Sequence, residues 1–596
     1  MPVVAISVKR LNELLGQSYD LEELVTALEQ LGCDVEDTVE LALYTCPFCE
    51  APVEKLDREE PPKRCDFCGG ESEMPFDRLA TDRAIRLELL AARPDLFDPG
   101  GLARALKGYL GLEQGLPEYF VKQGSVVLNV DPAVLRPESY RPFIVCAVVT
   151  MPPLDHNGLR EIMKLQENLH WGIGRDRKLA SIGVYDLATI TPPITYKTVD
   201  PVAFSFTPLG MPGQPMSPAA ILEHHPKGTA YAHLLLGLQN YPILIDSKGQ
   251  VLSMPPIINS EETKVKLGSE RLFIDVTGLT RDAVTKSLNT LVCSLVELGG
   301  QVESVLMNYP EGPARTPDLS PHTIRIKFEE AQKWLGLDFT PEEFMGYLRK
   351  MRFSVTPRDS AYEVGFPAFR TDIKHEVDIF EDLAIGYGFH RIPLHLVPTM
   401  TIGEARKEEL LSQTVREIMI GLGFTEIMSL NLQSEERHFH KFRMEPGEQH
   451  ALVANPKTVD QSMVRTHLMT GVMETFHKNR RKAVPQKIFE LGNVILLNPK
   501  KETGAEEYRH LVFAIIGPET GYAEVRSILD SVLREIGRKG EYQAESHPAF
   551  CEGRCARVTG TNGLWALLGE IHPEVLNNFG LAYPVALCEV RLGQVI

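Results

Sequence analysis

The feature that most constrains this chain is a run of carboxylates on one predicted helix, within residues 366–389 (FPAFRTDIKHEVDIFEDLAIGYGF). Asp378, Glu381 and Asp382 stand at i, i+3 and i+4, which places them on one helical face, and Asp372 lies a short step upstream. The apolar stripe that gives this helix a buried side is Ile373, Val377, Phe380 and Ala384. Like charges at this spacing repel each other, so we expect a cation among them, and oxygen ligands suit Mg²⁺. The alternative is a solvated acidic face on an acidic protein.

Composition limits the class of protein. The chain has 596 residues, enough for about three to five domains. Residues 1–15 lack the layout of a signal peptide, and no apolar run approaches the roughly 18 residues that span a bilayer, so we expect a cytoplasmic protein without membrane association. The ten cysteines are few and fit a reducing compartment. The net charge of -18 argues against the chain alone clamping a nucleic acid.

Two CxxC pairs interrupt the first hundred residues. Cys46-Pro-Phe-Cys49 and Cys65-Asp-Phe-Cys68 are separated by 15 residues, and each pair places two thiolates on a tight turn. The alternatives are two disulfides or a redox pair, but disulfides fit poorly with a reducing compartment, and a redox CxxC needs no twin. The spacing therefore predicts a structural Zn²⁺ site within residues 44–72. If this segment is an inserted loop, we expect it to share little core with its host.

Hydrophobic periodicity predicts a mixture of helices and strands. Residues 3–7 form a predicted strand, Asp20 caps a helix that Gly32 ends, and residues 93–111 contain a turn and a second helix. The later predictions are two strands around a turn at 246–249, a strand at 272–278, a helix at 283–298, a helix through 411–422 and a strand at 424–432. The Pro- and Gly-rich residues 309–321 and the run 394–403 are predicted linkers.

Several of these strings together resemble the phenylalanyl-tRNA synthetase beta subunit. They are the acidic run at 366–389, the strings GLARAL, LQENLHWGIGRDRKLASIGVYDL, GLQNYP, SMPPIINSE and DVTG, and GEIHPEVLNNFGL near the end. The resemblance covers nearly the whole chain apart from about 44–72. Two modules of bacterial-type subunits, an inserted OB-fold and a C-terminal anticodon-binding domain, have no room in this length, so the layout is similar to the archaeal and eukaryotic one.

The resemblance implies an α+β multidomain chain. Its expected parts are an N-terminal α/β domain at 1–117 with the zinc-finger-like insertion at 44–72, a mixed α/β tRNA editing domain at 118–307, a small helix-containing, metal-binding domain at 317–394, and a degenerate class II synthetase-like antiparallel-sheet domain at 403–596. In that family the matching acidic positions bind Mg²⁺ close to the alpha subunit. The implied ligands are Asp372, Asp378, Glu381 and Asp382.

The resemblance also implies a division of labour between two subunits. An adenylate-forming class II site needs cations for ATP, yet the predicted strand KIFELG and residues 563–590 contain no arginine. The aminoacylation site is therefore expected in an alpha partner of an α2β2 complex. This complex would use ATP, charge tRNA(Phe) with phenylalanine and hydrolyse mischarged Tyr-tRNA(Phe).

Editing has a physical motive, because an apolar phenylalanine pocket rejects tyrosine only about 10²-fold, whereas a site that hydrogen-bonds the hydroxyl discriminates by about 10⁴–10⁵. The family positions imply an amino-acid pocket of Leu244, Ser253, Asp275 and Thr277 with Asn259 nearby, and Gln166 and Arg177 facing the tRNA terminus. No Ser-His-Asp or Cys-His set is evident, so water is the expected nucleophile. Two alternative functions are a free-standing tRNA deacylase and a zinc-finger scaffold without catalysis.

Overall fold

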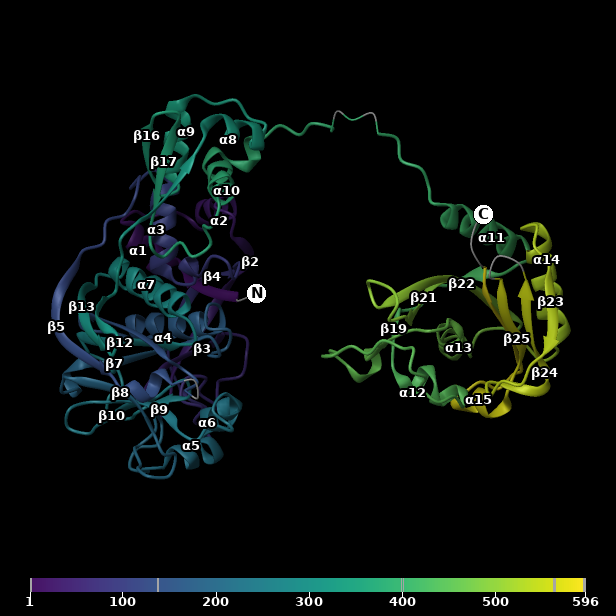
Figure 1. The fold of residues 1–596 in the computed structure, drawn as a ribbon, viewed down its shortest axis with the longest axis horizontal. Helices are drawn as coiled ribbons and strands as arrows, with labels where there is room; N and C mark the ends of the chain where they lie inside the picture. Colours follow the sequence, from purple (N-terminus) through teal and green to yellow (C-terminus); the bar gives the residue numbers. More distant parts are fainter. Residues whose placement is uncertain (1–2, 137–138, 398, 400, 561–563, 593–596) are drawn as a thin grey trace. The chain divides into compact units, whose positions relative to one another are not determined.

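The computed structural model describes residues 3–136, 139–397, 399, 401–560 and 564–592. Two compact units make up the chain, Met1–His395 and Leu396–Ile596, and Figure 1 colours them in chain order. Positions 398 and 400 of the predicted linker, and positions 593–596 of the last predicted domain, lie outside the described residues. Among the helices of the described ranges, none is long and apolar enough to cross a membrane.

The first unit begins with a four-stranded antiparallel sheet in the order β1-β4-β2-β3. Its strands are β1 (Val3–Ser7), β2 (Asp34–Thr45), β3 (Pro52–Leu56) and β4 (Asp77–Glu88), and the accompanying helices are α1 (Val8–Leu15), α2 (Leu21–Gln30) and α3 (Pro99–Tyr109). The predicted strand at 3–7 and the two predicted helices are confirmed. Asp20 and Glu23 form a reciprocal capping box that starts α2, with both hydrogen bonds 2.9 Å long.

A ten-stranded mixed sheet forms most of the first unit, in the order β11-β10-β9-β8-β5-β13-β6-β12-β7 with β14 beside β13. The strands are β5 (Val121–Val130), β6 (Phe143–Thr150), β7 (Ala180–Asp186), β8 (Ile194–Val199), β9 (Tyr241–Ile245), β10 (Val251–Met254), β11 (Ile258–Asn259), β12 (Arg271–Gly278), β13 (Gln301–Tyr309) and β14 (Gly312–Thr316). The predicted strand pair around 246–249 and the strand at 272–278 are confirmed. The predicted linker at 309–321 is partly wrong, because Gly312–Thr316 pairs with β13 as an edge strand.

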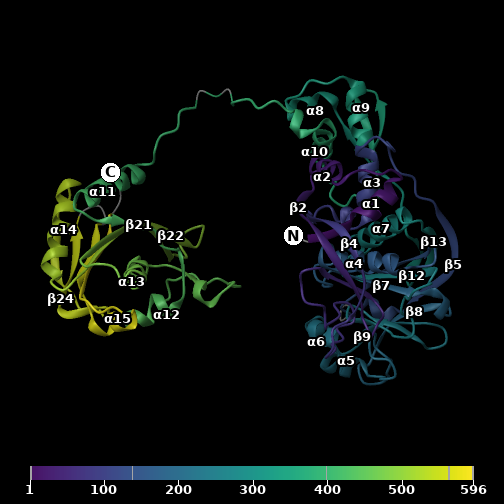
Figure 2. The ribbon, with the colours of Figure 1, turned by 180° about the vertical axis from the view of Figure 1, so that it is seen from behind.

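Each face of this sheet packs in a different core. Ile182, Val184 and Ile274 face α4 (His156–Trp171) and α7 (Arg281–Glu297), which lie together against the sheet (Figure 2). On the opposite face, Tyr185 of β7 and Leu244 of β9 share one core, although their strands lie near opposite ends of the strand order. The sheet is therefore curled, and its two ends approach each other. Two short helices follow β8, α5 (Pro218–His224) and α6 (Pro226–Tyr231).

A small three-stranded sheet with three helices completes the first unit. The strands are β15 (His322–Ile326), β16 (Ser354–Arg358) and β17 (Ala361–Phe366), and the helices are α8 (Phe328–Leu335), α9 (Pro341–Lys350) and α10 (Glu376–Tyr387). Helix α10 is the predicted acidic helix. Its predicted apolar stripe is confirmed, since Ile373, Phe380 and Ala384 are buried and Val377 is half-buried.

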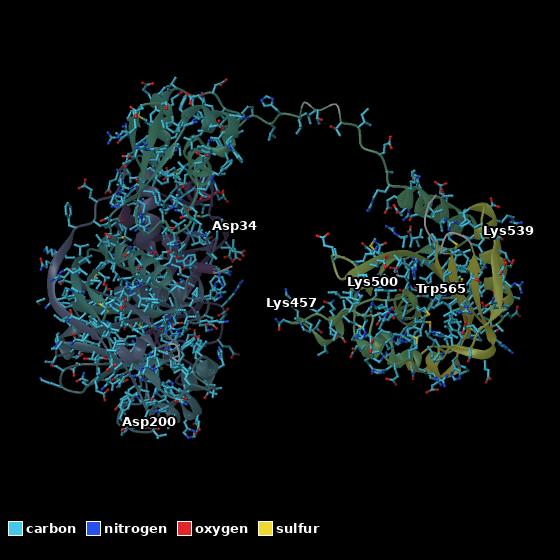
Figure 3. The ribbon with its side chains drawn as sticks, in the orientation of Figure 1. Asp34, Asp200, Lys457, Lys500, Lys539 and Trp565 are labelled. Carbon is cyan, nitrogen blue, oxygen red and sulfur yellow. The ribbon has the colours of Figure 1, made fainter. Side chains whose placement is uncertain are left out.

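The second unit is built on a seven-stranded sheet in the order β18-β21-β22-β26-β25-β24-β23. The strands are β18 (Thr425–Glu426), β21 (Gln486–Leu497), β22 (Ala505–Ile516), β23 (Gly540–Ala544), β24 (Phe550–Gly560), β25 (Trp565–Ile571) and β26 (Val585–Arg591), and β19 (Leu432–Gln433) pairs separately with β20 (Met463–Val464). The helices are α11 (Lys407–Gly421), α12 (Glu435–His438), α13 (Met469–Lys478), α14 (Tyr522–Glu535) and α15 (Pro573–Asn578). Figure 3 marks Lys500 in the β21–β22 turn and Trp565 at the start of β25.

One strand prediction in the second unit is wrong. The run 424–432 does not form one strand, because only Thr425–Glu426 pairs with the main sheet, and Leu432–Gln433 belongs to the separate pair. Met428 and Leu430, between them, are exposed. Alternating apolar residues predict a strand whether or not a neighbouring strand is available to pair with them.

Candidate functional site

A pocket lies at the edge of the ten-stranded sheet where its curled ends meet. Strand β7 is the last strand of the order, and its outer edge faces α4 and the β10–β11 segment. The pocket walls are mainly apolar, from Leu159, Ile162, Met163, Val184, Ile258 and Val265. The predicted residues Gln166, Arg177, Ser253, Asn259 and Asp275 all line this pocket.

The polar floor of the pocket joins three strands. Asp275 on β12 lies directly opposite Gly183 on β7, so the Asp275 side chain and the position of Gly183 lie on the same face of the sheet. The hydroxyl of Tyr185 lies 2.5 Å from Asp275 Oδ1 and 2.7 Å from Ser253 Oγ on β10, so it donates to the carboxylate and accepts from the serine. Burial raises the pKa of Asp275 to about 7, against the Tyr185 hydrogen bond and the Arg141 charge, which lower it.

Gly183 leaves the space in which this floor is assembled. A Cβ at this position would stand 2.0 Å from the Tyr185 hydroxyl and 2.4 Å from Asp275 Oδ1. Every other residue type would displace the phenol or the carboxylate. The glycine is therefore required by a close approach of side chains, with an ordinary strand backbone.

Arg177 brings a buried positive charge to the pocket. Arg175, Asp176 and Arg177 have φ of 47°, 55° and 64°, a run of left-handed residues that costs about 1 kcal/mol or more at each position. The conformation is held because the Arg177 guanidinium donates to Glu167 Oε1 at 2.5 Å and to the Ile257 carbonyl at 3.0 Å. The Arg177 guanidinium also lies over the aromatic ring of Tyr231 of α6, with its Cζ atom 4.6 Å from the ring centroid.

Side chains replace the missing neighbour of edge strand β7. Gln166 Nε2 donates to the Ile182 carbonyl at 2.7 Å, and His170 Nε2 accepts from the Ile182 N–H at 2.8 Å. Asn259 Nδ2 donates to the Val184 carbonyl at 3.4 Å. Gln166 and Asn259 thus line the pocket while satisfying strand groups that would otherwise lack partners.

Two predicted pocket residues lie elsewhere. Leu244 is fully buried in the core on the inner face of the curled sheet. The Thr277 hydroxyl accepts from Arg141 Nε at 3.3 Å and lies 3.1 Å from Ser181 Oγ. Thr277 therefore supports the buried Arg141, whose charge in turn lowers the pKa of Asp275.

Comparisons with known proteins identify the family. Residues 392–592 match the family model described as "Phenylalanyl tRNA synthetase beta chain CLM domain", and residues 324–389 match the "tRNA synthetase B5 domain". The phenylalanine–tRNA ligase beta subunit of Methanosphaera stadtmanae is 36% identical over 605 residues, which cover 100% of both chains. That of Methanosarcina barkeri is 40% identical over 549 residues, 91% of this chain and 98% of the relative. The chain belongs to the phenylalanine–tRNA ligase beta subunit family.

A solved structure of the same family supports the fold of the first unit. An N-terminal fragment of the phenylalanyl-tRNA synthetase beta subunit from Pyrococcus horikoshii matches with a TM-score of 0.56 and 34% identity. The match covers 65% of this chain and 99% of the fragment. The mixed α/β, multidomain fold class is thereby confirmed.

The four predicted cysteines converge in this member of the beta subunit family. The sulfurs of Cys46, Cys49, Cys65 and Cys68 all lie within 4.8 Å of one another, the one such cluster among the residues of the described ranges. Cys46 and Cys68 Sγ are 3.9 Å apart, and Cys49 and Cys65 Sγ are 3.7 Å apart. Four thiolates around one Zn²⁺ at about 2.3 Å would be about 3.8 Å apart, whereas a disulfide needs about 2.05 Å. The geometry fits a tetrahedral metal site and excludes the two disulfides.

The expectation that the insertion shares little core with its host is wrong. The cysteines are buried together with Tyr44, Val53 and Phe76, and Met163 of α4 and Leu209 pack against them. Strand β2 runs into the insertion as far as Thr45, and β3, which lies wholly within the insertion, pairs with β2. The prediction failed because the cysteine spacing identifies the metal ligands but does not show which residues of the host pack against them.

The predicted Mg²⁺ ligands do not form one cluster. Arg370 donates to Asp372 Oδ1 at 2.9 Å and to Asp382 Oδ2 at 2.5 Å, so a guanidinium occupies the expected place of a cation. Asp378 Oδ2 accepts backbone N–H groups from residues 374 and 375 and caps α10, while Glu381 is exposed. Asp382 Oδ1 is buried and has no hydrogen-bond partner among the residues that the structure describes. As they stand, the four carboxylates do not fit a shared metal ion.

Sequence reasoning missed Tyr185, Gly183, Arg141 and Glu167. Tyr185 and Gly183 lie in the string GVYDL, and their alternation with Ile182 and Val184 on one strand was the available signal. No local signal connects Arg141 with Thr277, because the pair is 136 residues apart in the sequence.

Proposed function

We propose that this chain is the beta subunit of a phenylalanine–tRNA ligase and that its pocket hydrolyses mischarged Tyr-tRNA(Phe). The observation that carries the proposal is the hydroxyl-binding floor of Asp275, Ser253 and Tyr185 in a pocket whose walls are otherwise apolar. A phenylalanine ring can enter such a pocket, but only tyrosine carries a hydroxyl that can join the floor.

Discrimination follows from the cost of leaving that floor without its partner. A site built to hydrogen-bond a hydroxyl rejects the analogue without it by about 10⁴–10⁵. In the proposed complex, the carboxylate of Asp275 accepts the substrate hydroxyl, with Tyr185 and Ser253 fixing its orientation. The neighbouring Gly183 keeps the ring end of the pocket open.

Arg177 is suited to hold the tRNA terminus. Its guanidinium is buried, and its Nε has no hydrogen-bond partner among the residues that the structure describes. A terminal phosphate would supply the missing acceptor. His170, the histidine of the pocket lining, already accepts from the Ile182 N–H through Nε2. The described lining residues thus offer no nucleophile–base pair that uses this histidine, and water remains the proposed nucleophile.

The proposed partner is an alpha subunit, in an α2β2 complex that uses ATP and charges tRNA(Phe). Support comes from large apolar side chains on the second unit, where Met428 is 95% exposed and Val459 is 81% exposed. Met428, Leu430 and Leu432 are all exposed and line one surface hollow, and contiguous exposed apolar surface of this kind commonly marks protein interfaces.

The two proposed metals have unequal support. A structural Zn²⁺ would be held by the four converging cysteines and would stabilise the fold of the 44–72 insertion. For Mg²⁺, the unpartnered Asp382 Oδ1 and the exposed Glu381 favour a bound cation, but the Arg370 pairs with Asp372 and Asp382 oppose it. Mg²⁺ at Asp372, Asp378, Glu381 and Asp382 therefore stays a prediction, which requires Arg370 to move.

The test is Asp275→Ala in the complete complex, assayed by single-turnover deacylation of Tyr-tRNA(Phe). Loss of a hydrogen bond to a charged group costs about 1.5–3 kcal/mol, or roughly one to two decades in rate. We expect deacylation to slow at least about tenfold. Phe-tRNA formation should be nearly unchanged, because that reaction is assigned to the alpha subunit. Unchanged deacylation would contradict the pocket assignment, and equal losses in both reactions would reveal a folding defect.

A further inference from the structure

The cysteine cluster and the pocket share a wall. Cys49 and Phe67, both from the 44–72 insertion, line the same pocket as Asp275 and Arg177. Phe67 is half-buried and packs against the buried cysteines. An element that the sequence presents as an addition to the N-terminal domain therefore contributes directly to a site on another sheet.

The insertion is fixed in this place by close backbone contacts. A Cβ on Gly69 would lie 2.7 Å from Cβ of Pro226, the first residue of α6. A Cβ on Gly210 would lie 2.8 Å from Cβ of Cys68. Both glycines have positive φ, 77° and 87°, so backbone shape and lack of a side chain are both required there.

These contacts lead to the rest of the pocket. The Leu209 N–H donates to the Asn259 carbonyl at 3.0 Å, and the Gly210 N–H donates to Glu261 at 2.9 Å. Helix α6, on which Gly69 rests, carries Tyr231 beside the Arg177 guanidinium. On the other side, β3 lies against α4, and Glu54 forms an ion pair with Lys164. The insertion is thus braced against α4 and the segment at Leu209, which line the pocket, and against α6, which contacts the lining residue Arg177.

Charges around this wall suit an anionic ligand. Lys227 of α6 is half-buried. Burial and the Arg177 charge lower its pKa, whereas the charges of Glu167 and of Asp66 in the insertion raise it. Lys264, which lines the pocket, pairs with Glu261 at 2.6 Å. Phe67 is an apolar, aromatic surface beside this group of cations, the combination that binds the base and phosphate of a terminal nucleotide.

From this geometry we propose that the cysteine insertion forms part of the substrate site and that Phe67 is its contact residue for the aminoacyl-adenosine end of the tRNA. The metal fixes the loop that presents Phe67, so metal loss opens the pocket wall. This inference rests on the proposed deacylation of Tyr-tRNA(Phe), and it assigns to that reaction a binding residue outside the editing domain.

The insertion supplies its own control residue. Phe48 and Phe67 occupy equivalent positions in the two CxxC turns, and both are half-buried against the same cysteines. Phe48 packs over Gly70 within the insertion and is not part of the pocket lining. Phe67→Ala and Phe48→Ala therefore remove the same ring from the same fold, but only the first removes a pocket wall.

The experiment measures binding and turnover separately in the complete complex. Binding of 3′-(L-tyrosyl)amino-3′-deoxyadenosine, a non-hydrolysable mimic of the charged end, is followed by calorimetry, and Tyr-tRNA(Phe) deacylation is followed at several enzyme concentrations. Zinc content and Phe-tRNA formation are measured for each variant. Phe67→Ala should weaken binding and raise the half-saturating concentration at least about tenfold, with zinc retained, whereas Phe48→Ala should leave both near wild type.

A second variant, Cys68→Ser, tests whether the metal is needed for binding of the mimic. It should lose about one zinc per chain and weaken binding of the mimic as Phe67→Ala does, with Phe-tRNA formation retained. Equal behaviour of Phe67→Ala and Phe48→Ala, or normal binding in the zinc-free variant, overturns the inference. If the wild type binds the mimic but deacylates nothing, the proposed function fails while the Phe67 comparison in the binding assay still decides this inference.

Discussion

At the scale of single residues, the pocket is defined by an internal phenol. Tyr185 satisfies Asp275 and Ser253 before any substrate arrives. Asp275 and Ser253, which the family resemblance assigns to a substrate pocket, both line the pocket of this structure, where Tyr185 contacts them as well. Sequence could not reveal the third partner, because Tyr185 reaches them from another strand, 90 residues from Asp275. A substrate hydroxyl must therefore share Asp275 with Tyr185.

The pH dependence of deacylation should report this shared carboxylate. Burial raises the pKa of Asp275 to about 7, and the Tyr185 hydrogen bond acts in the opposite direction. Ionised Asp275 is the form that accepts a substrate hydroxyl, so the wild-type rate should fall as the pH drops below about 7. Tyr185→Phe removes the donor, which raises the pKa of Asp275 further and moves the midpoint of the profile to higher pH.

The measurement is single-turnover deacylation between pH 5.5 and 8.5, with the spontaneous ester hydrolysis subtracted at each pH. Tyr185→Phe should be slowest relative to wild type near neutral pH and should recover at high pH. An unchanged midpoint would show that Asp275 does not titrate in this reaction.

At the scale of elements, the sequence predicts helices well and their ion partners poorly. The period of the apolar positions was sufficient to place α10 and its buried side. The same pattern could not place Arg370, which stands outside the helix and pairs with both Asp372 and Asp382. The acidic face was expected to need a positive group. In the structure Arg370 pairs with only two of the four carboxylates, while Asp378 accepts backbone N–H groups and Glu381 is exposed.

Removal of Arg370 should therefore destabilise the first unit. Arg370→Met leaves the buried Asp382 without its main counter-charge, which costs about 3–5 kcal/mol. Thermal unfolding of the first-unit transition measures the loss. Asp382→Leu in the same chain removes the stranded charge, so the double variant should recover much of the stability. A double variant no more stable than Arg370→Met would contradict this account of α10.

The strands of the second unit illustrate what residue types alone predict. The predicted strand KIFELG contains no arginine. In the structure two carboxylates are buried on the strands of this sheet, Glu490 on β21 and Glu589 on β26. Arg465 pairs with Glu490 at 2.7 Å, and Glu589 accepts the Leu468 N–H at 3.0 Å. The pairing of these groups could not be predicted, because Arg465 and Leu468 lie between β20 and α13 and the other partner of Glu589, His510, lies on β22, 79 residues away in the sequence.

At the scale of the whole molecule, the account separates two reactions. The described pocket lies wholly within Met1–His395, and its groups suit recognition of a hydroxyl and hydrolysis by water. The family assignment extends over both units, because relatives align over 100% of the chain. The central claim is that this chain recognises and hydrolyses the wrong product, whereas phenylalanine activation requires the alpha subunit.

The most direct test assays one preparation of the chain, alone and with the alpha subunit, for phenylalanine-dependent ATP–pyrophosphate exchange and for deacylation of Tyr-tRNA(Phe) and Phe-tRNA(Phe). We predict no exchange by the chain alone, exchange once the alpha subunit is added, and deacylation by the complex of the tyrosyl ester in strong preference to the phenylalanyl ester. Exchange by the isolated chain, or equal hydrolysis of the two esters by the complex, would contradict it.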